Sequence, residues 1–307
     1  MDRQSINQQR DRAIGALVGL AIGDAIGTTL EFRTRDTYEH VTDMIGGGPF
    51  QLKPGQWTDD TAMALALADS LDQKRSLDEA DLLNRFCNWW QYGEYSCTGE
   101  CFDIGITTRA ALSRWLATDD PLSGSTDPDT AGNGSLMRLA PVALRYWNDS
   151  AKLCDVAARQ SRTTHGAAEA VDSCVAFAGL LADAITHGDR LALFDRHPFE
   201  GAVRVQEILS GEWRHKARAE IRSSGYVIHS LEAALWCVWQ TDYFADAVLL
   251  AANLGDDADT VAAITGQLAG ALYGRTGIAE TWIDRLAWSA EIQGYAERLF
   301  DTSLAKD

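Results

Sequence analysis

Two clusters of Asp and Thr residues have the composition of a divalent-cation site. Residues 58–61 (Thr-Asp-Asp-Thr) precede the apolar run 62–67, and residues 256–260 (Asp-Asp-Ala-Asp-Thr) precede the apolar run 261–264. The free N–H groups of a helix N-terminus stabilise one nearby carboxylate, but not several. Buried carboxylates that lie together repel one another or take up protons unless a cation neutralises them. We therefore expect the two clusters to form the two halves of one metal site.

The ligand types indicate which metal would bind. Carboxylate and hydroxyl oxygens suit Mg²⁺ or Mn²⁺ better than zinc or copper. Two such ions could orient substrate oxygens and activate a water molecule. For each cluster alone, the alternative is an ordinary helix N-cap made by Thr58, Asp59 or Asp257. Two clusters of the same kind, whose charges add, favour the metal interpretation.

Two further carboxylates lie in or just after the first expected helix. Glycines recur every four residues, at positions 15, 19, 23 and 27, so they share one helix face and predict close contact with another helix. Asp24 is a charge inside this apolar helix and needs partners if it is buried, so we expect it to support the site structurally. Glu31 follows the helix, and either lies on the surface or stands at the mouth of the site.

A glycine-rich segment could bind phosphate. Residues 132–135 (Gly-Asn-Gly-Ser) lead into an expected helix, where glycines allow close approach and free N–H groups attract anions. The alternative is an ordinary Asn-Gly turn followed by a Ser N-cap. Arg138, one turn further on, would either contact the phosphate or be solvated.

His165 and Tyr226 are weaker candidates. His165 is followed by Gly166 where a helix is expected to end, which is a favourable arrangement without any function. Tyr226 follows a Ser-Ser-Gly loop, and could either stack on a base or pack in the core.

The composition predicts an all-α chain. Of 307 residues, 46% are hydrophobic and only 6 are proline, and apolar residues recur at helical spacing almost throughout. We expect a single domain over residues 1–307, with a polar N-terminal segment at 1–11. The expected helices cover about 8–27, 60–74, 78–92, 103–117, 135–147, 150–163, 167–187, 200–210, 229–240, 242–253, 260–273 and 280–303.

Charge and composition also limit the partners. The net charge of −17 disfavours nucleic acid and anionic membrane surfaces. The longest apolar stretch, 14–26, contains Asp24 and is too short to span a bilayer. The polar start lacks the apolar segment of a secretory signal, and the six cysteines show no zinc-like pairing. We therefore expect a cytoplasmic protein with free thiols, and a monomer.

Five segments together resemble the ADP-ribosylglycohydrolase family, which includes the ADP-ribosylarginine hydrolases. They are residues 15–31, with the pattern Gly-Ala-x-x-Gly-x-Ala-x-Gly-Asp-Ala-x-Gly, then 53–61, 132–138, 164–165 and 257–260. Each motif alone is weak, but five in the family's order over most of the chain are specific. The resemblance implies a single compact orthogonal helical bundle with a central cleft that holds two Mg²⁺ or Mn²⁺ ions.

The resemblance also implies roles for individual residues. By position, the metal ligands would be Thr58, Asp59, Asp60, Asp257, Asp259 and Thr260. Glu31, together with Asp59 and Asp60, would take part in catalysis, Glu31 as a carboxylate that gates or assists the step. The positions that line the ADP-ribose pocket would be Asn133, Gly134, Ser135, His165 and Tyr226.

Two departures from the family pattern are present. Asp256 stands where many relatives have glycine, and it adds a charge without an inherited role. Some relatives have Asp three residues before the Asn of Gly-Asn-Gly, but here that position is Thr130, with Asp129 one residue earlier.

The implied activity is metal-dependent hydrolysis of the bond between ADP-ribose and a modified protein side chain, with arginine as the first expectation. One alternative is hydrolysis of another ADP-ribose linkage, to serine, a nucleobase or an O-acetyl group. Another is a non-catalytic protein that binds ADP-ribose or a toxin. The implied partners are an ADP-ribosylated protein and, in some relatives, a cognate ADP-ribosyltransferase toxin.

Overall fold

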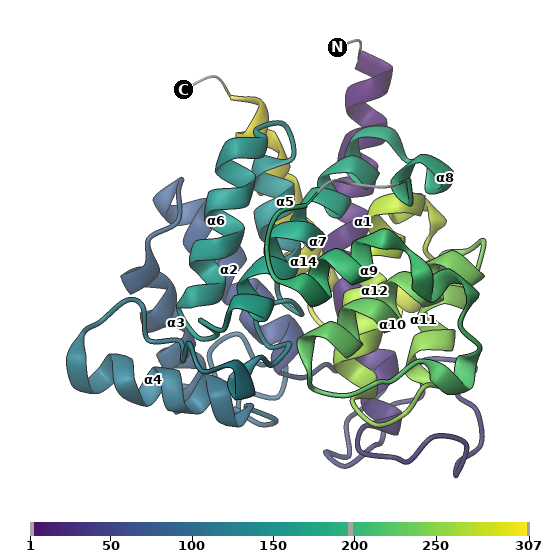
Figure 1. Cartoon of the computed structure of the whole chain (residues 1–307), viewed down its shortest axis with the longest axis horizontal. Coiled ribbons are helices and arrows are strands. Elements are labelled where there is room, and N and C mark those ends of the chain that lie inside the picture. The colour runs from purple at the N-terminus through teal and green to yellow at the C-terminus, as the bar shows by residue number, and fades with distance from the viewer. Residues whose placement is uncertain (1–2, 196–198, 306–307) are drawn as a thin grey trace.

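The computed structural model describes residues 3–195 and 199–305, and its regular structure is helical (Figure 1). Over these residues there is no strand, only three isolated β-bridges. The α-helices are α1 (Arg3–Gly27), α2 (Asp59–Lys74), α3 (Glu79–Tyr92), α4 (Ile106–Thr118), α5 (Ala140–Tyr146), α6 (Ser150–Arg162), α7 (Ala168–His187), α8 (Arg190–Leu193), α9 (Val203–Ser210), α10 (Val227–Gln240), α11 (Phe244–Ala252), α12 (Ala258–Tyr273), α13 (Glu280–Arg285) and α14 (Ser289–Leu304). The 3₁₀ turns are η1 (Thr28–Leu30), η2 (Pro128–Thr130), η3 (Glu212–His215), η4 (Arg218–Glu220) and η5 (Arg275–Gly277). The all-α prediction is confirmed.

Helices α1 and α12 form the centre of the fold. A Cβ atom added to Gly15, Gly19 or Gly23 would lie 2.1–2.3 Å from a backbone oxygen of α12. Gly15 faces Gly270, whereas Gly23 faces Ala262, so the two helices run antiparallel with their backbones in contact. The predicted close helix contact at the glycine face is therefore correct. This pairing brings the end of α1 beside the start of α12, which is where the second acidic cluster lies.

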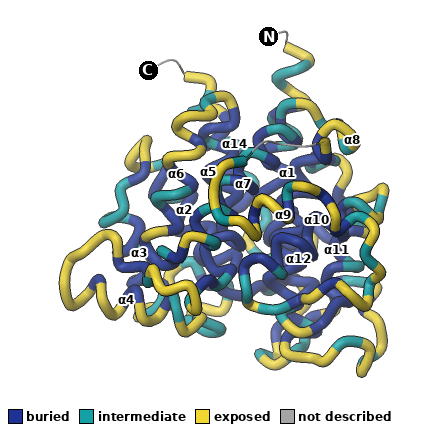
Figure 2. The backbone as a smooth tube through the Cα atoms, in the orientation of Figure 1, coloured by how far each residue is buried: buried dark blue, intermediate teal, exposed yellow. Residues whose placement is uncertain are grey.

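The remaining helices surround this pair. Figure 1 shows α3 and α4 on one side of α1 and α12, with α10 and α11 on the other. Figure 2 shows that α1 and α12 are buried over most of their length, while α4 and the outer loops are largely exposed. Most of the buried hydrophobic side chains form one contiguous cluster. By length and composition, residues 3–30 could span a membrane, but 94% of their most apolar 18-residue window is buried inside the protein.

Several helix boundaries differ from the expectations. Helix α1 begins at Arg3, so most of the polar segment 1–11 is helical. Helix α4 begins at Ile106 instead of residue 103, because Asp103 has a positive φ of 60° and cannot lie in a helix. The expected helix 280–303 is divided into α13 and α14 at Trp288, whose φ is 56°.

The expected helix 135–147 is shortened to α5. Pro141 lies in its first turn, where the missing N–H group of proline costs no hydrogen bond. Residues 135–139 form hydrogen-bonded turns instead, with the N–H groups of Leu136 and Met137 both donating to Asn133 O. The glycine-rich segment therefore stays a loop with its backbone groups near the cleft.

Candidate metal centre and adjoining cavity

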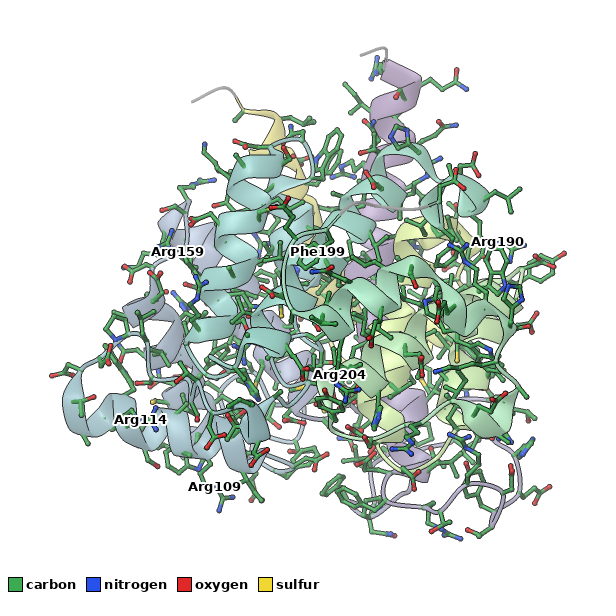
Figure 3. The ribbon with its side chains drawn as sticks, viewed as in Figure 1. Arg109, Arg114, Arg159, Arg190, Phe199 and Arg204 are labelled. Carbon is green, nitrogen blue, oxygen red and sulfur yellow. The ribbon has the colours of Figure 1, made fainter. Side chains whose placement is uncertain are left out.

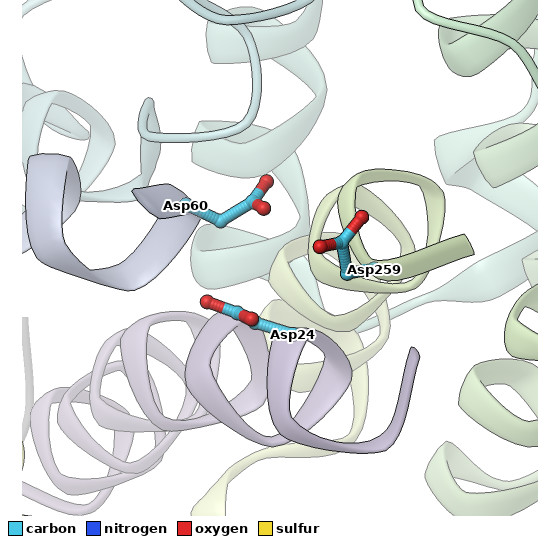
Figure 4. A group of neighbouring side chains, drawn as sticks. All are labelled: Asp24, Asp60 and Asp259. Atoms are coloured by element: carbon cyan, nitrogen blue, oxygen red, sulfur yellow. The ribbon is translucent and has the colours of Figure 1, made fainter. Parts of the chain in front are cut away.

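Three carboxylates from three helices meet at the junction of α1, α2 and α12. Asp24, Asp60 and Asp259 each offer an oxygen within 4.8 Å of the others, and their side chains point toward one another in Figure 4. All three are buried. The antiparallel contact of α1 with α12 places Asp24 beside Asp259, and the start of α2 brings in Asp60. The two acidic clusters thus lie together, as the sequence predicted.

Asp24 has a structural role in this group. Its Oδ1 accepts hydrogen bonds from the N–H and hydroxyl of Thr58, both at 2.9 Å. Its Oδ2 accepts the N–H and hydroxyl of Thr61, at 3.0 and 2.6 Å. Since both oxygens already have two donors, Asp24 orients the first turn of α2, as expected from a charge buried in an apolar helix.

The oxygens around Thr58 outnumber the available protons. Thr58 Oγ1 lies 3.2 Å from Asp60 Oδ2 and 3.3 Å from Asp259 Oδ2, in addition to its contact with Asp24. A hydroxyl has one proton, so it can donate to only one of these three carboxylates. Thr260 Oγ1 also lies 3.4 Å from Asp60 Oδ2. Within the described chain, buried Asp60 Oδ1 accepts no hydrogen bond. This excess of hard acceptors fits a divalent cation.

A second carboxylate group shares Asp259 with the first. Glu31, Asp257 and Asp259 offer oxygens within 4.8 Å of one another. Glu31 Oε2 also accepts the N–H of Ala258 at 2.8 Å and of Asp259 at 3.4 Å, so it caps the start of α12. The two oxygen groups are therefore adjacent and have Asp259 in common. Asp59, the other predicted ligand of the first cluster, begins α2. Its side chain lines a cavity that extends from these carboxylates and is described below.

Burial and crowding raise the pKa values of Asp24, Asp59, Asp60 and Asp257. Burial, followed by the charge of Asp259, raises the pKa of Asp24 to about 7 and that of Asp257 to about 6. Burial and neighbouring carboxylates also raise the pKa of Asp59 and Asp60 well above the ordinary range. Bound cations would remove the repulsion between these carboxylates. Raised pKa values are expected for a carboxylate cluster that binds cations when no cation is bound.

Asp103 is a site residue that the sequence did not reveal. It lines the cavity from the loop before α4, and burial, followed by the charges of Asp59 and Asp259, raises its pKa to about 11. The segment around it has no metal-ligand spacing and was expected to begin a helix. Its positive φ turns the chain toward the cavity, and no pattern in the sequence signals that turn.

A cavity of about 530 Å³ extends from these carboxylates. Gly132, Asn133, Gly134 and His165 form part of its wall, together with the acidic groups. Asn133 Nδ2 donates to Asp257 Oδ2 at 2.7 Å, which ties the glycine-rich loop to the metal-ligand cluster. Three of the predicted substrate-binding residues, Asn133, Gly134 and His165, therefore line one cavity with four of the six predicted ligands. These four are Asp59, Asp257, Asp259 and Thr260, whereas Thr58 and Asp60 lie behind the cavity wall.

The Ser135 side chain departs from the prediction. It is fully buried and does not line the cavity, because its hydroxyl pairs with Ser161 Oγ at 2.8 Å. Arg138 also differs from both of its expected roles. It is fully buried behind the loop, where it is neither solvated nor in the cavity.

Tyr226 lies in an adjoining hollow. It lines a space of about 600 Å³ with Asp129 and Glu169, and this space shares Gly132 and Gly225 with the main cavity. The Tyr226 hydroxyl donates to Glu169 Oε2 at 2.5 Å, and the ring is partly buried. The side chain therefore does not belong to the core, and it lies in a hollow that adjoins the main cavity.

Asp256 is exposed at the rim of the cavity. Its φ of 56° lies in the left-handed region, which glycine adopts more readily than other residues. Its backbone pairs with the segment after Glu31, through Phe32 N to Asp256 O and Asp256 N to Arg33 O, both 2.8 Å. Asp256 therefore links the two loops that carry Glu31 and Asp257.

Comparisons with known proteins identify the family to which this chain belongs. A protein of Pseudomonas putida (strain GB-1) named ADP-ribosylarginine hydrolase Tri1 is 50% identical over 294 residues, covering 96% of this chain and 79% of that protein. The ADP-ribosyl-[dinitrogen reductase] glycohydrolase of Rhodospirillum rubrum is 34% identical over 285 residues, covering 92% of each chain.

A solved structure agrees with these relatives. A chain of an ADP-ribosylglycohydrolase-related protein complex superimposes with a TM-score of 0.87 at 40% identity, covering 97% of this chain and 100% of that one. The family profile described as ADP-ribosylglycohydrolase matches residues 5–307. The chain belongs to the ADP-ribosylglycohydrolase family.

Proposed function

We propose that this protein removes ADP-ribose from modified arginine side chains by metal-dependent hydrolysis. The observation that carries the proposal is the pair of carboxylate groups that share Asp259 at one end of a cavity walled by Gly134 and His165. Two relatives that are each 50% identical, from Pseudomonas putida and Serratia proteamaculans, are named ADP-ribosylarginine hydrolases. The names of these two relatives favour arginine over the other linkages.

Two Mg²⁺ or Mn²⁺ ions would be held by the clustered oxygens, and these come from Thr58, Asp59, Asp60, Asp257, Asp259 and Thr260. Such ions orient substrate oxygens and lower the pKa of water. Asp24 and Asn133 hold the ligands in place, through Thr58 and Asp257 respectively. Ligands fixed in this way keep their geometry when substrate enters.

In the hydrolysis, the oxygen of water forms a bond to C1″ of the ribose while the bond from C1″ to the arginine nitrogen breaks. One water proton ends on the released nitrogen. Glu31 is the carboxyl placed for this transfer, because it lies against Asp257 and Asp259 and also lines the cavity. We assign Glu31 the proton relay.

The test is a panel of ADP-ribosylated substrates, linked through arginine, serine, a nucleobase and an O-acetyl group. We expect Mg²⁺-dependent release of ADP-ribose from the arginine conjugate, and its loss in Asp60→Asn. Release from another linkage at a higher rate would reassign the substrate. Calorimetric binding of ADP-ribose with no turnover of any conjugate would make the protein a binder instead of an enzyme.

The partner that follows from this activity is an ADP-ribosylated protein. A cognate ADP-ribosyltransferase toxin, a monomeric state and a cytoplasmic location remain predictions of the sequence. Co-purification with a catalytically inactive transferase and sedimentation of the full chain would test the first two.

A further inference from the structure

Arg138 is a buried cation behind the cavity. Its side chain is fully buried, whereas Arg109, Arg159 and Arg190 lie at the periphery of the molecule in Figure 3. Burial lowers the pKa of Arg138 to about 9, so it stays charged at neutral pH. No carboxylate of the described residues forms an ion pair with it. A buried charge without a counterion is costly, so its partners need an explanation.

The partners of Arg138 are neutral oxygens, the sulfur of Met63 and one aromatic face. Its Nε donates to Gln160 Oε1 at 3.1 Å, and Nη1 donates to Gly134 O at 3.2 Å. Its Nη2 donates to Gln160 O at 3.1 Å and to Thr164 Oγ1 at 2.9 Å. The guanidinium carbon lies 4.5 Å from the ring centroid of Phe86. The guanidinium group thereby links the glycine-rich loop to Thr164, the residue just before His165.

The hydrogen bond from Arg138 to Thr164 determines the direction of the hydrogen bond between Thr164 and His165. Arginine can only donate, so Thr164 Oγ1 is the acceptor in that pair. Thr164 Oγ1 also lies 2.9 Å from His165 Nδ1, and these are its two hydrogen-bond contacts in the described chain. Thr164 is fully buried, so its hydroxyl proton stays unpaired unless it is donated to Nδ1. His165 Nδ1 is therefore the acceptor, and the ring proton lies on Nε2.

The other side of the His165 ring faces the glycine-rich loop. A Cβ atom added to Gly134 would lie 2.8 Å from His165 Cε1, and one added to Gly132 would lie 3.3 Å from Nε2. Both glycines and His165 line the main cavity, and no described residue forms a hydrogen bond with Nε2. Burial, followed by the charge of Arg138, lowers the pKa of His165 to about 3, so the ring is neutral.

We propose that Arg138 and Thr164 are positioning residues that hold His165 in the Nε2–H tautomer, so that this N–H donates to an oxygen of the ADP-ribose group in the cavity. The buried charge of Arg138 adds positive potential on the same side, which favours an anionic diphosphate in a protein of net charge −17. The identity of the ligand rests on the proposed function, but the tautomer does not.

The test is side-chain ¹⁵N NMR of the full chain in Mg²⁺, without substrate, with the His165 signals assigned by comparison with His165→Gln. We expect an unprotonated Nδ1 and a protonated Nε2 in the wild type. In Thr164→Val the two nitrogen shifts should move toward each other, and calorimetry should show about tenfold weaker binding of ADP-ribose. Thr164→Ser should restore both.

Thr163→Val is the matched control. Thr163 Oγ1 also lies 3.4 Å from Arg138 Nη2, but it donates to Gln160 O and does not contact the His165 ring. We expect this variant to keep the wild-type ¹⁵N pattern. A wild-type Nδ1–H signal, or shifts and affinity unchanged in Thr164→Val, would overturn the proposal. Failure of the proposed function appears separately, as the absence of arginine-linked turnover in a wild type with the expected tautomer.

Discussion

Asp24 Oδ2 accepts both the backbone N–H and the hydroxyl of Thr61, at 3.0 and 2.6 Å. Through this pair, the last turns of α1 fix the first turn of α2, on which Asp59 and Asp60 are carried. Because α1 also contacts α12 backbone to backbone, one helix positions both halves of the metal-ligand cluster. The carboxylates are thus assembled by helix packing.

Asp24→Asn is expected to lower the free energy of unfolding by about 1–3 kcal/mol, because an amide N–H₂ replaces an oxygen that accepts two hydrogen bonds. It should also weaken Mg²⁺ binding, since Thr58 and Asp60 lose their fixed turn. Chemical denaturation and calorimetry measure the two effects. Asp119→Asn, at an exposed left-handed helix end, is the control and should change neither. A wild-type metal affinity in Asp24→Asn would contradict the role assigned to Asp24.

Asp60→Asn should separate function from stability. Its loss of charge relieves repulsion in the metal-free protein, so we expect a higher Tm than that of the wild type in EDTA at pH 7.5. With Mg²⁺ present, the order should reverse, and turnover should fall by more than about 100-fold. Thermal denaturation of the wild type and the variant, with and without Mg²⁺, measures this reversal in the order of their Tm values. If the variant were less stable under both conditions, Asp60 would be a structural acid and not a metal ligand.

The stability of the metal-free protein should fall as pH rises. Asp257, with a pKa of about 6, and Asp24, with a pKa of about 7, both titrate near 3.9 when unfolded. Between these values the folded state binds more protons than the unfolded state, so the free energy of unfolding decreases from about pH 4 to about pH 7. Denaturation in EDTA across this range measures the slope. Saturating Mg²⁺ should make the free energy of unfolding nearly independent of pH in this range. A free energy of unfolding that rises with pH in EDTA would contradict the crowding of these carboxylates.

These features differ in how far the sequence predicts them. The acidic clusters and the glycine face were predictable, because charge next to an apolar run and four-residue spacing are local signals. The buried state of Arg138 was not, since a single cation near a helix start carries no sign of its surroundings. Asp103 and Ser135 depended on backbone turns whose direction is set by distant packing, so their orientation required the structure.

Gly19→Ala tests the central helix pair. The new Cβ atom would lie 2.2 Å from Gly266 O, and neither backbone can move without displacing the metal-ligand cluster. We expect a loss of several kcal/mol, or no folded protein, by denaturation and circular dichroism. Gly179→Ala is the matched control in α7, since no atom lies within 4 Å of its added Cβ. There, the better helix propensity of alanine should raise the free energy of unfolding by up to about 1 kcal/mol.

Glu31→Gln tests whether this residue does more than cap α12. The Gln carbonyl can still accept the N–H groups of Ala258 and Asp259, so the start of the helix should remain formed and ADP-ribose should bind nearly as in the wild type. The amide cannot relay a proton, so kcat should fall by about 100-fold or more. Glu31→Ala removes the cap as well and should also lower the Tm. An unchanged kcat in Glu31→Gln would limit Glu31 to the helix cap and transfer the proton relay to Asp103, another carboxyl of the cavity wall.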